Sequence, residues 1–153
     1  MQQNLSMLNI SSNLTLRTMK TIASLELVDV KSIAIAAEAE AIKNRWAVTI
    51  AIVDDGGHLL FLQRLDGAPP VSAHIAPSKA HTAAMGRRES KVYEDSINGG
   101  RVSFLSAPFL HGMLEGGVPI MKDGQCLGAV GVSGVKSNED VQIARAGIAA
   151  IGL

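Results

Sequence analysis

The sequence has few aromatic residues and a single cysteine. Aromatic side chains make up only 3% of the 153 residues, so the core must consist of Ala, Val, Ile and Leu with some Met. Small side chains at this level predict helices and strands that lie close together. Cys126 excludes an internal disulfide and a zinc site built from several cysteines. Its apolar neighbours predict that this thiol is buried in the core.

An excess of charge of one sign and long apolar runs are also absent. The 14 basic and 14 acidic residues balance, so no basic field is available to bind a nucleic acid. No stretch reaches the roughly 18 apolar residues that cross a membrane, and we expect no membrane association. The N-terminal residues lack the basic leader and the apolar segment of a secretory signal. These features predict a cytoplasmic protein.

What is present is enough for one globular domain. A chain of 153 residues, 47% of them apolar, can bury a single sizeable core. Residues 1–22 are polar and rich in Ser and Asn, and we expect a poorly ordered extension there. Residues 23–153 are predicted to form a single domain.

The order of helical and strand patterns predicts an α+β fold. Apolar residues at helical spacing mark helices, and β-branched or apolar runs on either side of Gly-containing turns mark antiparallel hairpins. The predicted elements are a helix at 27–44, strands at 48–53 and 58–65, helices at 71–86 and 92–97, strands at 118–122 and 125–132, and a helix at 138–152. Pro77 predicts that its helix either begins near that residue or kinks there. Hairpins with helices between them favour α+β over a doubly wound parallel sheet.

Three glycines in the last predicted hairpin raise the question of a phosphate-binding loop. Gly128, Gly131 and Gly134 recur every three residues, which matches neither the dinucleotide fingerprint nor the P-loop. They also lie within a predicted strand rather than in a turn before a helix. Glycine weakens a strand, so its presence there predicts close approach by another backbone or by a ligand. Both alternatives stay open at this point.

Two histidines and a methionine share one face of the helix predicted at 71–86. His74, Ser78, His81 and Met85 are spaced i, i+4, i+7 and i+11. His74 and His81 are two turns apart, roughly 10.5 Å on an ideal helix, so they cannot readily chelate one small metal ion. Either this face binds a large flat ligand or a partner chain, or it is an ordinary exposed pair of histidines. No metal-binding or nucleophile motif is present, so we predict no metal site and identify no catalytic residue.

Basic residues near this helix form a second candidate feature. Arg64 ends the first predicted hairpin, and Lys79 and Arg87 lie within and just after the following helix. Together these cations could bind a carboxylate or a propionate group. The alternative interpretation is a solvated charged surface.

Three segments of the sequence resemble the GlcG/HbpS family, also called the haem-degrading or DUF336 domain. The segments are "IAIVDDGGHLLFLQRLDGA", "SKAHTAAMGR" and "GGVPIMKDGQCLGAVGVSG", and the resemblance extends over residues 25–152. It implies a profilin-like α/β/α arrangement, with a five-stranded antiparallel sheet flanked by helices. It also implies self-association, with homo-oligomers from dimers to octamers.

This resemblance and the His/Met face of the helix at 71–86 lead to the hypothesis of an oligomeric binding protein for haem or a related tetrapyrrole, with a role in haem breakdown or iron handling left open. The missing secretory signal places it in the cytoplasm under this hypothesis. Under this hypothesis Arg64, Lys79 or Arg87 pairs with the propionates, and His74, His81 or Thr82 lies near the iron. The alternative is an enzyme or accessory protein for a small carboxylate or diol, such as glycolate, glycerol or propanediol, or for corrinoid metabolism. A third possibility is a scaffold that only assembles. Whether any reaction is catalysed stays open.

Overall fold

The computed structural model describes residues 19–153, so the extension predicted at residues 1–22 lies mostly outside the described residues. The elements are α1 (Leu27–Asn44), β1 (Thr49–Asp54), β2 (Leu59–Arg64), α2 (Ser72–Gly86), α3 (Lys91–Asn98), the 3-10 helix η1 (Val102–Ser106), β3 (Gly117–Lys122), β4 (Gln125–Ser133) and α4 (Ser137–Ala149). Between residues 19 and 153, no helix combines the length and the apolar character that a membrane crossing requires.

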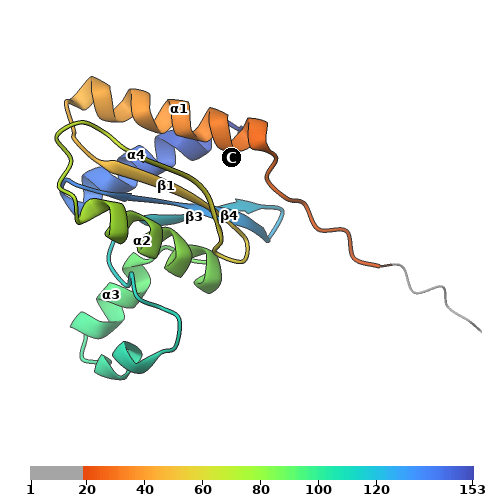
Figure 1. Cartoon of the computed structure of the whole chain (residues 1–153). Coiled ribbons are helices and arrows are strands. Elements are labelled where there is room, and N and C mark those ends of the chain that lie inside the picture. The colour runs from red at the N-terminus through yellow and green to blue at the C-terminus, as the bar shows by residue number, and fades with distance from the viewer. Residues whose placement is uncertain (1–18) are drawn as a thin grey trace, which may run out of the picture.

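The strands form one antiparallel sheet with helices on both faces. Within residues 19–153 the sheet has four strands in the order β2-β1-β4-β3. Figure 1 shows α1 and α4 on one face and α2 on the other, with α3 and η1 projecting away from the sheet. The predicted α+β class and the order of helices and hairpins are confirmed. The fifth strand that the resemblance implied is not found among the described residues.

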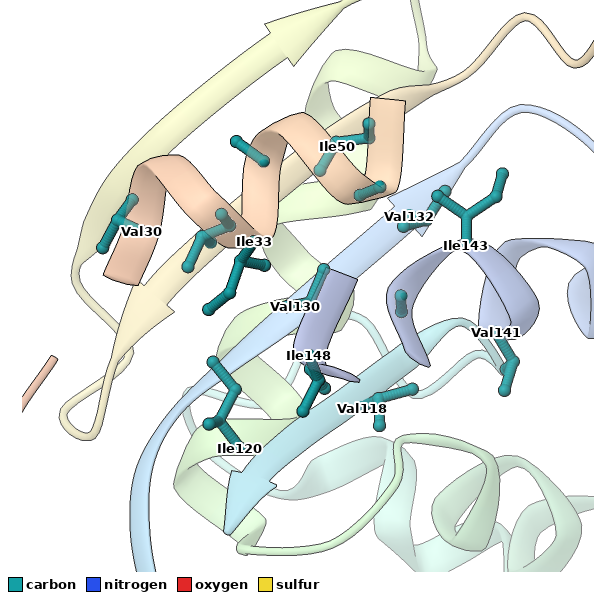
Figure 2. Packing of buried hydrophobic residues seen from close by; sticks show 14 of the residues in the cluster. Val30, Ile33, Ile50, Val118, Ile120, Val130, Val132, Val141, Ile143 and Ile148 are labelled. Atoms are coloured by element: carbon teal, nitrogen blue, oxygen red, sulfur yellow. The ribbon is translucent and has the colours of Figure 1, made fainter. Parts of the chain in front are cut away.

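The face of the sheet under α1 and α4 carries the larger core. Along β1, Ile50 and Ile52 point to this face, whereas Ala51 and Val53 point to the opposite face. This alternation follows from the two-residue period of a strand. Figure 2 shows how the branched side chains of the sheet and of both helices meet in this layer. The labelled residues are Val30, Ile33, Ile50, Val118, Ile120, Val130, Val132, Val141, Ile143 and Ile148.

The face under α2 is built from small residues. Its buried members are Ala51, Val53, Ala76, Ala80, Ala83, Ala84 and Ala129. Gly131 of β4 lies directly under the helix, because a Cβ at that position would collide with the backbone of Ala76 and Ala80. The helix and the sheet therefore approach closely, as the scarcity of aromatic residues predicted.

The glycine-rich hairpin of β3 and β4 is a packing feature. Its turn has φ values of 48° at Asp123 and 74° at Gly124, the positive pair that a type I′ turn requires. A Cβ at Gly128 would collide with the carbonyl of Val53 on β1, so the close neighbour at this position is also a backbone. Of the two alternatives left by the sequence, the structure confirms approach by another backbone.

Helix α2 continues through Pro77. It begins at Ser72, five residues before the proline, which agrees with the helix predicted at 71–86 and excludes the alternative of a start near Pro77. The proline lies early in the helix and is among the residues that line a surface hollow. Cys126 is buried and forms no disulfide, as predicted.

Candidate functional site

An apolar hollow lies beside the outer face of α2. Its volume is about 330 Å³, within the range of small-molecule sites. The turn between β1 and β2 forms one wall, and the chain segment after η1 forms another. The lining residues are Val53, Gly57, Leu59, Pro77, Ser78, His81, Phe109 and His111. Two imidazoles thus project into an otherwise mostly apolar space.

His81 is held in one tautomer by the backbone of the β1–β2 turn. Its Nδ1 lies 3.2 Å from the carbonyl oxygen of Gly57. A carbonyl oxygen can only accept a hydrogen bond, so Nδ1 carries the hydrogen. In the neutral ring the lone pair is then on Nε2, which is the arrangement of an imidazole ready to bind a metal.

The turn that holds His81 depends on glycine. Gly57 has a φ of 79°, and a Cβ at this position would collide with the His81 ring. Asp54 fixes the turn by accepting hydrogen bonds from the N–H groups of Gly56 at 2.9 Å and His58 at 2.8 Å. Burial acts to raise the pKa of Asp54, but these bonds and the His58 ring outweigh it and lower the pKa below its usual value. Asp54 is therefore a turn-forming residue.

His111 reaches the hollow from an irregular segment that is anchored to α2. The N–H of Gly112 donates a hydrogen bond to Oγ1 of Thr82 at 3.2 Å, and a Cβ on Gly112 would collide with the backbone of Ser78. Thr82 is completely buried, so it positions this segment. His111 was not selected from the sequence, because the residues around it show no helical or strand period.

A second hollow adjoins the first at His111. Its volume is about 300 Å³, and it lies between α3, η1 and the anchored segment. Its lining residues are Glu94, Ile97, Asn98, Leu105, His111, Met113 and Leu114. His111 therefore belongs to the walls of two neighbouring apolar hollows.

Lys79 lies in the interior, away from both hollows. Its Nζ donates hydrogen bonds to Oδ2 of Asp140 at 2.9 Å and to the carbonyl oxygen of Val132 at 3.0 Å. Only 4% of Lys79 is exposed. The ammonium is thus engaged in a buried ion pair that joins α2 to α4, and this engagement removes Lys79 from the candidate ligand set.

The remaining predicted residues do not converge on the hollow. Arg64 lies five residues along β2 from Leu59, about 16 Å away along the strand. His74 is exposed on α2, two turns before His81. Arg87 follows the end of α2 and lines a separate polar hollow of about 70 Å³ with Asp55 and other residues. The cationic cluster inferred from the sequence is therefore not assembled within the described residues, and a small-carboxylate site built from it loses its support.

The family model described as "Haem degrading protein HbpS-like" matches residues 25–149. The chain belongs to this family. GlcG of Escherichia coli K12 is 53% identical over 115 residues, which cover 75% of this chain and 85% of GlcG.

Two solved structures have a similar fold. The Klebsiella pneumoniae protein ORFY superposes with a TM-score of 0.81 at 26% identity, covering 89% of this chain and 96% of that one. A structure described as a PduOC:haem complex superposes with a TM-score of 0.76 at 30% identity, covering 84% of this chain and 95% of the other. The predicted family membership is thus confirmed, and one relative is known in complex with haem.

Proposed function

We propose that this protein binds haem or a related tetrapyrrole in the hollow lined by His81 and His111. The observation that carries the proposal is the hydrogen bond between Nδ1 of His81 and the Gly57 carbonyl, which leaves Nε2 available beside an apolar surface. The haem complex of the PduOC relative supports the same ligand class.

The residues of the hollow suit a flat apolar macrocycle with a metal at its centre. Leu59, Pro77 and Phe109 offer apolar surface to a ring, and burying apolar area contributes about 25 cal/mol per Å². A neutral imidazole is a common axial ligand of haem iron. His81 would hold the iron, and the bound group would supply the redox chemistry of the iron.

Titration of the purified protein with haemin tests the proposal. We expect a shifted Soret band that saturates at one haem per chain at micromolar concentration. His81→Ala should raise Kd at least tenfold, which corresponds to about 1.4 kcal/mol. His74→Ala is the matched control, because the residue lies on the same helix but outside the hollow, and its Kd should stay within twofold of the wild type. A wild-type protein that leaves the Soret band of haemin unshifted would refute the proposal.

Gly57→Ala tests the role of the β1–β2 turn. The added Cβ displaces the His81 ring and strains a backbone with φ of 79°, so we expect weaker haem binding and an altered Soret maximum. Arg64→Gln and Arg87→Gln test the propionate partners predicted from the sequence. Because both arginines lie outside the hollow, their replacement should change Kd less than His81→Ala does.

A further inference from the structure

The two edges of the sheet differ in how well they are protected against pairing with another strand. The β3 edge contains Pro119, which has no N–H to donate, and ends in Lys122. Proline and lysine are the usual devices that prevent a strand from joining an edge. The β2 edge, with the sequence LLFLQR, contains neither. The pairing of β2 with β1 contains a β-bulge at Leu60. After the bulge, residues Phe61–Arg64 of β2 pair with β1 in regular register.

The β2 edge is also apolar and exposed. Leu59, Leu60 and Leu62 are exposed by 53%, 42% and 42%, respectively. Within residues 19–153, β1 is the only strand paired with β2. An unpaired strand edge that exposes several large apolar side chains is a template for another strand.

We infer that β2 pairs antiparallel with β2 of a second copy of this chain, across a two-fold axis. The two four-stranded sheets then join into one continuous sheet of eight strands. A two-fold contact places the same surface on both sides, so Leu60 and Leu62 of one copy pack against those of the other. Backbone pairing needs no ligand, so the inference does not rest on haem binding.

The charges at the two ends of β2 favour a second copy in the antiparallel orientation. Asp54 and Asp55 lie at the turn before β2. Within residues 19–153 the basic partner of Asp54 is His58, at 3.1 Å, whereas Asp55 forms no ion pair and lines a hollow with Arg87. Arg64 ends the strand at its other end. Asp66 lies beyond Arg64 but lines a hollow together with Arg45. Antiparallel pairing brings the basic end of one copy beside the acidic turn of the other.

Analytical ultracentrifugation of edge variants tests this inference. We expect the wild-type protein to contain at least two chains at micromolar concentration. Leu62→Lys places a charge on the β2 edge and should halve the number of chains in the particle. Met121→Lys is the matched control, because Met121 lies on the β3 edge with a similar exposed fraction of 37%, and this variant should keep the wild-type mass. A monomeric wild type, or a Leu62→Lys variant of unchanged mass, would overturn the inference.

Amide hydrogen exchange separates strand pairing from other kinds of dimer. The amides of residues 59–64 that do not bond to β1 should be protected in the wild type and in Met121→Lys, with protection that falls on dilution. In Leu62→Lys they should exchange faster, while those of β4 stay protected and show that the variant is folded. Removal of residues 1–18 tests the other possible occupant of this edge. Protection that is independent of concentration and lost in the truncated chain would assign the edge to the N-terminal segment and refute the pairing of two copies.

Discussion

Replacement of Lys79 by methionine is predicted to destabilise the protein without altering its ligand site. The variant leaves the Asp140 carboxylate 2% exposed and without its cationic partner. Removal of one partner from a buried ion pair costs about 3–5 kcal/mol. For a chain of this length that loss lowers Tm by about 10 °C.

The double variant Lys79→Met/Asp140→Leu should be more stable than Lys79→Met alone. It removes both charges, and its remaining cost comes from two backbone groups that lose a partner, the Val132 carbonyl and the Val135 N–H. At about 1 kcal/mol each, this cost is about 2 kcal/mol. Urea unfolding followed by circular dichroism, at one fixed protein concentration, gives the free energies of unfolding for the cycle.

The pH dependence of Lys79→Met provides a second check. Burial raises the pKa of Asp140 in the folded protein, although Lys79 and the Val135 N–H act to lower it. Without Lys79 the carboxyl binds a proton more readily in the folded state than in the unfolded state. The stability of the variant relative to the wild type should therefore improve as pH falls from neutral toward the ordinary pKa of a carboxyl group. Three results would refute this account of Lys79. They are a loss of unfolding free energy below about 1 kcal/mol in Lys79→Met, a double variant no more stable than Lys79→Met, and a haemin Kd that changes more than twofold in Lys79→Met.

Two further predictions concern the small-residue face. Gly131→Ala places a methyl group against the α2 backbone and should lower the free energy of unfolding by about 1–3 kcal/mol, and Gly131→Val should lower it further. The Cβ of Gly124→Ala meets open space, so this variant should lose only about 1–2 kcal/mol of unfolding free energy, from backbone strain. Burial raises the pKa of Cys126, so a thiol reagent at neutral pH should modify it slowly in the folded protein and fast in urea. Equal rates in the two conditions would show that the thiol is accessible in the folded protein.

Local chemistry was sufficient to predict most of the secondary structure. The bounds of α1 agree with the predicted helix at 27–44, because its apolar spacing and terminal residues lie within the segment itself. The hairpin predicted from strands at 118–122 and 125–132 likewise turns at Asp123 and Gly124, two adjacent residues whose backbone preferences suit a tight turn. In both cases the interactions that select the structure are between near neighbours in the sequence.

The composition of the site could not be predicted in this way, because it depends on contacts between distant segments. Lys79 was assigned to ligand binding, yet its partner Asp140 is 61 residues away, and no sequence spacing indicates that the two meet. Arg64 and Arg87 flank α2 in the sequence but lie apart in the fold. His111 was missed because its position depends on the contact of Gly112 with Thr82, which joins an aperiodic segment to a helix.

The segment "SKAHTAAMGR", which carries part of the family resemblance, shows how little of such a motif concerns a ligand. Five consecutive residues at the start of the segment have four different environments, because each step along a helix turns by about 100°. Ser78 and His81 line the hollow, Lys79 enters the interior, Ala80 packs on the sheet and Thr82 holds the segment after η1. Packing, charge pairing and hydrogen bonding therefore account for Lys79, Ala80 and Thr82. In this segment the case for haem binding depends on His81, and the motif as a whole is primarily evidence for the fold.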